Sequence, residues 1–289
     1  MLRSRFREFG QSSRGKEMKN IGLHFRFKDT ITEVIDQAFE LKVPIFQCFF
    51  TDYIHKKQVE VNPQVIETFR RLSQNVKRLY AHGSYLINLA DDREHYILKR
   101  ELELSRKLGF KYLILHPGAF KPAFQTLEQG IDSIVKNVNK IMKHELDITL
   151  ILENTAFGGS VIGGDFRHFD SIFNRLDFPE RVRFCLDTAH AYVYGYDLNN
   201  NEMQKSFLEM LKSSSFRNFI QLIHLNNSSS ALSSGIDSHA ILFEGKIAPD
   251  NLKTFVKDSL FSTIDLILEM PEISKERKKD ILIEVASWF

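Results

Sequence analysis

Short apolar runs alternate with longer amphipathic stretches along the chain from about residue 20 to the last residue. The short runs predict strands, because they are rich in Val, Ile, Leu and Phe and are bounded by polar or turn-forming residues. The eight predicted strands are 21–25 (IGLHF), 44–50 (PIFQCFF), 78–83 (RLYAHG), 112–118 (YLILHPG), 149–156 (TLILENTA), 182–190 (VRFCLDTAH), 219–226 (FIQLIHLN) and 264–270 (IDLILEM).

The stretches between the predicted strands have the spacing of helices. In segment 91–109 the apolar residues recur at about helical period, with Asp91 as a predicted N-cap and Gly109 as a predicted C-terminal cap. Eight strand–helix units follow one another without a linker between residues 20 and 289. We therefore expect an α/β protein in which residues 20–289 form a single (β/α)8 TIM barrel.

The composition agrees with such a barrel. The chain has 289 residues, of which 43% are hydrophobic and 26% charged, and one barrel commonly takes about 250 residues. No apolar run reaches the roughly 18 residues that span a bilayer, so no membrane partner is expected. The two cysteines, Cys48 and Cys185, both lie within predicted strands. They make no disulfide framework, which favours a reducing intracellular setting and a soluble protein.

Residues 1–19 are more polar and more basic than the rest of the chain, and we interpret them as a mobile tail. A transit-like leader and an arm that touches phosphates are the alternatives, so organelle targeting stays open beside cytoplasm, nucleus or, for a virus, the virion. The formal net charge is +2 and the pI is about 8.4, which neither demands nor excludes nucleic acid. We expect a monomer.

Six of the predicted strands end in a histidine or a carboxylate: His82, His116, Glu153, Asp187, His224 and Glu269. Alternate residues of a strand share a face, so an apolar residue inside the barrel is followed two positions later by one of these polar residues. Active sites of TIM barrels lie at this carboxyl-terminal rim. The pattern therefore predicts one cluster of metal-ligand residue types.

Loops add three more candidates, which are His190, Asp237 and His239. A single zinc ion takes about four ligands, so these nine side chains suit two or three ions of zinc or manganese. Any one strand-end histidine is more often a hydrogen-bonded rim residue than a ligand. Buried together without metal, however, six carboxylates and histidines would repel or stay unsatisfied. We place His24, His55, His95, His144 and His168 outside the cluster, with His24 as the exception to watch because it also ends a strand.

With these residues in place, the sequence resembles the endonuclease IV family of apurinic/apyrimidinic (AP) endonucleases. The matching segments, in order from about residue 21 to 270, are HGSYLINLA (82–90), LHPGAF (115–120), LENTAFGGSVIGGDF (152–166), CLDTAHAYVYGYD (185–197), HLNNSSSALSSGIDSHAILFEGKI (224–247) and LILEM (266–270). The resemblance implies three zinc ions, with manganese as an alternative at one site. His82, His116 and Glu153 would hold the first; Glu153, Asp187, His224 and Glu269 the second; and His190, Asp237 and His239 the third.

The activity implied by the resemblance is hydrolysis of the phosphodiester on the 5′ side of an abasic site in double-stranded DNA, which is a step of base excision repair. The products would be a 3′-hydroxyl and a 5′-deoxyribose phosphate. Glu153, as the bridging ligand, and Glu269, which would orient the attacking hydroxide, are the implied catalytic residues. Tyr85 and Leu86 match the residues with which the family fills the gap in the base stack.

The loops depart from the family pattern where DNA is gripped. The arginine expected after the second strand is missing from FTDYIHKKQVEV (50–61), where Tyr53, His55, Lys56 and Lys57 are possible substitutes. We place His55, Lys56 and Lys57 in the DNA-binding set together with Asn226. Ser229 and Ser238 replace a lysine and an arginine of the family. Fewer cations in these loops imply fewer phosphate contacts.

Two other functions fit the same residues. The first is a metal-dependent sugar isomerase or epimerase, since related barrels gather His, Glu and Asp at the same rim. One or two ions would suffice for it, which leaves His190, Asp237 and His239 without a role. The second is a damaged-DNA-binding protein that has lost part of its catalysis.

Overall fold

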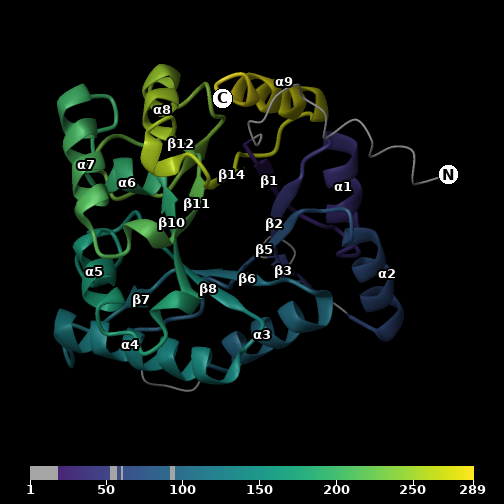
Figure 1. The fold of residues 1–289 in the computed structure, drawn as a ribbon, viewed down its shortest axis with the longest axis horizontal. Coiled ribbons are helices and arrows are strands. Elements are labelled where there is room, and N and C mark those ends of the chain that lie inside the picture. The colour runs from purple at the N-terminus through teal and green to yellow at the C-terminus, as the bar shows by residue number, and fades with distance from the viewer. Residues whose placement is uncertain (1–18, 53–56, 60, 92–94) are drawn as a thin grey trace.

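Eight parallel strands pair edge to edge into a closed barrel (Figure 1). The structure is a computed structural model that describes residues 19–52, 57–59, 61–91 and 95–289. The barrel strands are β1 (Ile21–Phe25), β2 (Ile45–Phe49), β5 (Arg78–His82), β6 (Tyr112–Leu115), β8 (Thr149–Glu153), β10 (Val182–Asp187), β11 (Ile220–His224) and β14 (Asp265–Leu268). They are neighbours in chain order, and β14 closes the ring against β1. The predicted TIM barrel is confirmed.

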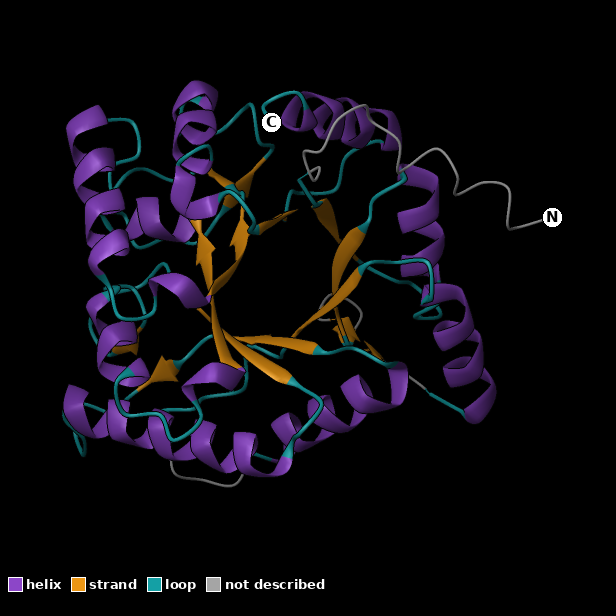
Figure 2. Ribbon diagram, in the orientation of Figure 1, coloured by secondary structure: helices purple, strands orange, loops and turns teal. Residues whose placement is uncertain are grey.

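Helices surround the strands on the outside, as the purple ring around the orange strands in Figure 2 shows. They are α1 (Glu33–Leu41), α2 (Pro63–Ser73), α3 (Tyr96–Leu108), α4 (Leu127–His144), α5 (Arg167–Phe173), α6 (Thr188–Tyr194), α7 (Asn201–Ser213), α8 (Pro249–Val256) and α9 (Lys275–Ala286). Three short 3-10 helices, η1 (Pro179–Arg181), η2 (Arg217–Phe219) and η3 (Ser259–Phe261), precede strands. None of the helices in the described ranges is both long and apolar enough to cross a membrane.

The predicted helix at 91–109 begins later than expected. Gly109 caps its carboxyl end in a left-handed conformation with φ of 86°, as predicted, but the helix starts at Tyr96 and its N-cap is His95. Asp91 is therefore not the N-cap. Its carboxylate instead accepts a hydrogen bond from the Lys121 ammonium at 2.9 Å, which ties the loop after β5 to the loop after β6.

One layer of side chains fills the inside of the barrel. It consists of Ile45, Tyr80, Ile114, Ile151, Cys185, Leu222 and Ile267, all at most 1% exposed. The remaining strand, β1, contributes Gly22, which pairs with Ile45 of β2 and Ile267 of β14. A Cβ atom at Gly22 would lie 2.2 Å from the Ile45 carbonyl oxygen, so a larger residue does not fit.

Polar groups close the amino-terminal end of the barrel. The buried Asp265 carboxylate accepts hydrogen bonds from the Tyr80 hydroxyl at 2.6 Å and from the Arg78 guanidinium at 2.8 Å. Asn20 donates a third at 2.7 Å. Because each oxygen of this buried acid has a partner, the amino-terminal end is a satisfied structural network.

Short antiparallel pairs extend the loops at the opposite, carboxyl-terminal end. They are β3 (Thr51–Asp52) with β4 (Lys57–Gln58), β7 (Gly118–Ala119) with β9 (Val161–Ile162), and β12 (Asn227–Ser228) with β13 (His239–Ala240). The β12–β13 pair matters most for the site, because it returns the chain from β11 to the rim and delivers His239 there. Residues 1–18 lie outside the described ranges, so the tail and the division of the chain at residues 19 and 20 stay predictions.

Candidate metal centre

Every strand of the barrel places a polar residue two positions beyond the inner layer. The eight residues are His24, Gln47, His82, His116, Glu153, Asp187, His224 and Glu269, and they share the rim at the carboxyl ends of the strands. Their common orientation follows from the two-residue repeat of a strand, since residues two apart point to the same face. The structure thus brings together the six strand-end ligands predicted from the sequence and adds two residues that were not predicted.

Glu153 stands between two groups of possible ligands. The first group is His82, His116 and Glu153, whose ligand atoms lie within 4.8 Å of one another. Glu153 Oε2 is 2.9 Å from His82 Nε2 and 3.3 Å from His116 Nε2. The other oxygen of the same carboxylate, Oε1, lies 2.7 Å from His224 Nδ1. Glu153 therefore has the geometry of a bridging carboxylate.

The second group comprises Glu153, Asp187, His224 and Glu269, again within 4.8 Å. His224 Nδ1 is 3.3 Å from Glu269 Oε2 and 3.8 Å from Asp187 Oδ2. Asn226 bridges the two acids, because its amide nitrogen donates to Asp187 Oδ2 at 2.5 Å and to Glu269 Oε2 at 3.0 Å. This shared donor offsets part of the repulsion between two carboxylates that lie close together.

The turn from β10 into α6 links the second group to the third. Asp187 is the N-cap of α6, and its Oδ1 accepts the backbone N–H of His190 at 2.7 Å. An aspartate at this position satisfies a free N–H of the first helical turn through one oxygen. Its other oxygen, Oδ2, accepts the hydrogen bond from Asn226 and faces the candidate ligands. The i, i+3 spacing of Asp187 and His190 is therefore the spacing of a cap and the first turn that it stabilises.

The third group is Asp187, His190 and His239, and Asp237 lies beside it. Asp237 Oδ2 is 3.2 Å from His190 Nε2, and Asp237 Oδ1 is 3.4 Å from His239 Nε2. The sequence-based set of His190, Asp237 and His239 is thus together in space. Asp187 joins it, since its Oδ2 is 3.7 Å from His239 Nε2.

Three of the histidines are held in the same way. In each of them Nδ1 faces a backbone carbonyl oxygen: Gly83 for His82 at 2.9 Å, Asn154 for His190 at 2.8 Å and Glu269 for His239 at 3.0 Å. A carbonyl only accepts, so Nδ1 carries the hydrogen and Nε2 is turned toward the carboxylates. A second partner of this kind is what orients histidines that bind metals.

The residues present fit a cation. The Nε2 atoms of His190 and His239 are buried and have no hydrogen-bond partner among the described residues, although the Asp237 carboxylate is close to both. An imidazole lone pair and a carboxylate oxygen that face each other are both satisfied by a positive ion between them. Imidazole nitrogens with carboxylate oxygens are the donor set that zinc accepts.

The pKa shifts in the cluster show that its acids favour positive charge nearby. Burial alone would raise the pKa of Glu153, but His224 and His116 hold it well below its usual range. Burial alone would lower the pKa of His190, but Asp187 and Asp237 raise it well above its usual range. A metal ion at these positions would compete with the protons, so its binding should release protons and weaken in acid.

Cys185 also lies within 4.8 Å of Glu153 and His224. Its side chain belongs to the apolar layer one step below the rim. Burial raises the pKa of this thiol to about 12, which disfavours the thiolate that metals bind. We therefore leave Cys185 out of the ligand set.

Comparisons with known proteins identify the family. The family model described as xylose isomerase-like TIM barrel matches residues 35–289. A probable endonuclease 4 of Thermosipho melanesiensis is 30% identical over 274 residues, which cover 91% of this chain and 96% of that protein. The chain belongs to the endonuclease IV family.

Two further relatives extend the match to a eukaryote and to a solved structure. An apurinic-apyrimidinic endonuclease 1 of Plasmodium berghei is 27% identical over 269 residues, which cover 89% of this chain and 52% of that protein. The crystal structure of endonuclease IV from Thermus thermophilus has a TM-score of 0.75 at 26% identity and covers 93% of this chain and 98% of that chain. These endonuclease IV relatives support a nuclease of the AP endonuclease kind.

The DNA-binding residues expected from the sequence differ in whether the structure describes them and in how exposed they are. Tyr85 and Leu86 are 57% and 73% exposed in the loop after β5, with the Tyr85 ring 5.4 Å from the His116 ring at the rim. Asn226 is only 1% exposed and is occupied by the carboxylates described above. His55 and Lys56 lie outside the described residues, and so does the side chain of Lys57.

The sequence analysis missed one rim residue, Gln47, and left a second, His24, outside the cluster although it noted that His24 ends a strand. Gln47 is fully buried at the end of β2, and His24 lies beside it on β1. A glutamine inside the apolar run PIFQCFF, in phase with Ile45, was the available signal. Of the histidines set aside, His168 accepts the Gly163 N–H at 3.1 Å and His95 bonds the Asp91 carbonyl at 3.1 Å, which are structural contacts.

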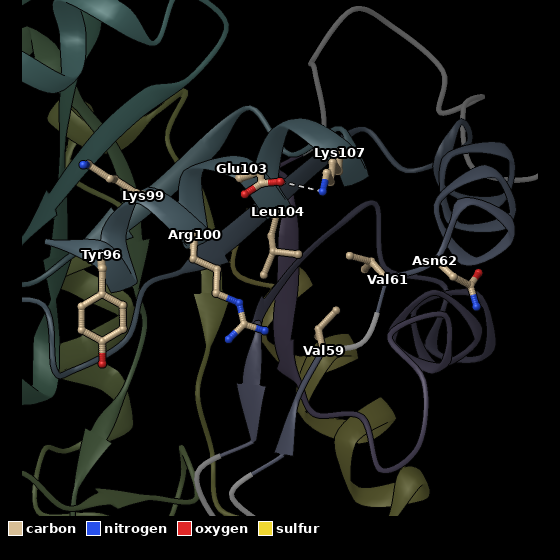
Figure 3. A pocket seen from close by; sticks show the side chains of 9 residues that line it. All are labelled: Val59, Val61, Asn62, Tyr96, Lys99, Arg100, Glu103, Leu104 and Lys107. Atoms are coloured by element: carbon tan, nitrogen blue, oxygen red, sulfur yellow. Dashed lines mark ion pairs between the residues drawn. The ribbon is translucent and has the colours of Figure 1, made fainter.

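A pocket of about 720 Å³ lies away from the metal centre, between α3 and the segment that leads into α2 (Figure 3). It is lined by Val59, Val61, Asn62, Tyr96, Lys99, Arg100, Glu103, Leu104 and Lys107. Glu103 and Lys107 pair across its wall at 2.6 Å. None of the candidate ligands lines this cavity, so its size does not mark the site of the chemistry.

Proposed function

We propose that the protein cleaves double-stranded DNA on the 5′ side of abasic sites, using zinc ions held by the three groups at the rim. One observation carries the proposal: the Nε2 atoms of His190 and His239 have no hydrogen bond in the described residues, and both face the Asp237 carboxylate. Membership of the endonuclease IV family supports the choice of a phosphodiester as substrate. A sugar isomerase would need fewer ions than the rim can hold.

The three groups divide the work of holding metal. His82, His116 and Glu153 would hold one ion, and Glu153, Asp187, His224 and Glu269 a second. His190, Asp237 and His239 would hold a third, with Asp187 beside them. Zinc bound there would lower the pKa of water and neutralise charge that develops on the phosphate. Glu153 contributes by joining the first two groups through opposite oxygens.

The chain's own residues would position the reactants. Glu269 stands at the edge of the second group, where its carboxylate is 14% exposed and can orient the attacking water toward phosphorus. Water adds to phosphorus, the bond to the 3′ oxygen breaks, and that oxygen leaves as a 3′-hydroxyl beside a 5′-deoxyribose phosphate. Leu86 and Tyr85 would fill the gap in the base stack, so that the abasic nucleotide can leave the duplex at low cost.

Incision of a labelled duplex that carries one abasic site tests the proposal. We expect one cut 5′ to the lesion, a 3′ end that a polymerase extends, and no cut in an undamaged duplex. Treatment with a chelator should abolish the cut, and added zinc should restore it. No incision by the zinc-loaded protein, or sugar isomerisation in a parallel assay, would contradict the proposal.

A pair of variants tests whether the incision rate depends on the metal centre or falls with any loss of an acidic side chain. Glu153→Gln should lower the incision rate by about 10²-fold, because it weakens two metal groups at once and loss of a residue that only supports a metal ligand already costs about 10- to 100-fold. Glu128→Gln changes an acid that is 61% exposed and paired with Arg175, and it should leave the rate unchanged. Equal activity of the two variants would remove Glu153 from the mechanism.

A further inference from the structure

Gln47 makes hydrogen bonds in three directions beneath the metal groups. Its side chain is fully buried at the end of β2. Its amide nitrogen bonds Glu269 Oε1, and the same nitrogen is 3.0 Å from His24 Nδ1. Its amide oxygen is 2.7 Å from His224 Nε2. A single neutral side chain thus contacts two of the candidate ligands and a third rim residue.

The orientation of the Gln47 amide follows from its neighbours. The Glu269 carboxylate can only accept, so the amide nitrogen, which carries two hydrogens, must face it. The second hydrogen goes to His24 Nδ1. The amide oxygen is then left for His224, and an oxygen only accepts. His224 Nε2 therefore carries a hydrogen and donates it to Gln47.

This contact makes His224 different from the other oriented histidines of the centre. His82, His190 and His239 are held through Nδ1 by backbone carbonyls and present Nε2. His224 is held through Nε2 by a side chain and presents Nδ1, which faces Glu153 at 2.7 Å and Glu269 at 3.3 Å. A backbone carbonyl survives any substitution, whereas the partner of His224 depends on one residue.

We propose that Gln47 is a positioning residue of the second metal group. It fixes the hydrogen of His224 on Nε2, so that Nδ1 is the nitrogen offered to metal, and it holds one oxygen of Glu269 so that the other points into the same group. His24 supports Gln47 by accepting its second hydrogen. The inference rests on the proposed metal-dependent function and goes beyond it, because it assigns a role to the two strands that supply no predicted ligand.

Zinc affinity is the measurement that separates positioning from simple stability. Gln47→Met keeps the length of the side chain but removes all three hydrogen bonds. Loss of a partner of a metal-binding histidine typically costs 10- to 100-fold in metal affinity. We expect competition with a chromogenic chelator to show one zinc per chain bound about 10- to 100-fold more weakly, while the remaining zinc is held as in the unaltered protein.

Gln204→Leu is the matched control, because Gln204 is also buried and its amide also bonds two groups. It donates to the carbonyl oxygens of Leu198 at 2.9 Å and Asn251 at 3.0 Å on the outside of the barrel. This variant should lose stability without a change in zinc affinity. Gln47→Leu serves as a second test if the methionine variant does not fold.

The outcomes distinguish this inference from the proposed function. Weakened zinc binding in the Gln47 variant, with normal binding in the Gln204 variant, supports it. Unchanged affinity in the Gln47 variant, or an equal loss in both variants, overturns it and leaves the proposed function standing. If the unaltered protein binds no zinc, the proposed function fails first and this inference fails with it.

Discussion

The Nε2 atom of His190 lies 3.2 Å from Asp237 Oδ2 without a hydrogen bond between them. Since His190 Nδ1 faces the Asn154 carbonyl, Nε2 is the nitrogen that His190 would offer to a cation beside Asp237. Asp237→Ala should therefore lower the zinc content by about one ion per chain and reduce incision about 10²-fold. Elemental analysis of the purified protein measures the loss. Asp132→Ala, which removes only an exposed partner of Arg175, should keep the full content.

Glu269 should separate DNA binding from cleavage. Its carboxylate is a ligand candidate and the proposed guide for the attacking water, whereas Asn226 and Gln47 hold it from either side. We expect Glu269→Gln to slow incision by about 10²- to 10⁴-fold, the range for a positioned acid–base group. Affinity for an abasic duplex, measured by fluorescence anisotropy, should stay within a few fold. Full cleavage by this variant would exclude the role given to Glu269.

Leu86 should matter for DNA but not for the fold. Its side chain is 73% exposed, and exposed substitutions change stability by about 0.5 kcal/mol or less. We expect Leu86→Ala to leave the melting temperature and zinc content unchanged while weakening abasic-duplex binding about 10-fold. Leu146 is 79% exposed after α4 and gives a control, since Leu146→Ala should bind as before. Similar affinities for the two variants would show that Leu86 does not enter the duplex.

Glu101 of α3 predicts how stability depends on pH. It is 3% exposed, its Oε2 has no hydrogen-bond partner among the described residues, and burial raises its pKa from 4.5 to about 7. The folded protein then holds this proton more tightly than the unfolded chain does. The contribution of Glu101 to the free energy of unfolding is therefore complete below about pH 4.5 and is lost as the pH rises through 7. The cost above pH 7 is on the order of 3–4 kcal/mol, because each unit of pKa difference corresponds to about 1.4 kcal/mol.

Glu101→Gln removes the charge and should therefore raise the melting temperature by several degrees at pH 8 but not at pH 5. Calorimetry at the two pH values makes the comparison. Glu103→Gln, two residues away, alters an acid that is 55% exposed and paired with Lys107. It should change the melting temperature little at either pH. An equal effect of Glu101→Gln at both pH values would contradict the assignment.

The positions of the candidate ligands on the strands were predictable because a strand has a fixed repeat. Once Ile151 is assigned to the interior, Glu153 must share its face, and the same step connects Leu222 with His224. The register of a closed barrel then brings such residues to one rim. Local pattern and the geometry of the fold were together sufficient for this part of the site.

The other parts of the site depend on contacts between distant segments. Nothing local indicates that Asp237 approaches His190, and this grouping came from family resemblance. Gln47 was not predicted because a single glutamine in an apolar run gives no sign of a role by itself. Its three hydrogen-bond partners come from other strands and are known only from the fold. The start of α3 was misplaced because Asp91 suits an N-cap locally, whereas Lys121 engages it in the folded chain.

Both cysteines are buried, and burial raises the pKa of both thiols, that of Cys185 to about 12. Peroxide attacks exposed thiolates, and neither residue provides one at neutral pH. The candidate metal ligands likewise bind through nitrogen and oxygen atoms, so an oxidant finds no sulfur ligand to oxidise. Zinc held at the rim, as proposed above, should therefore survive a peroxide treatment that would release zinc from a cysteine-ligated site.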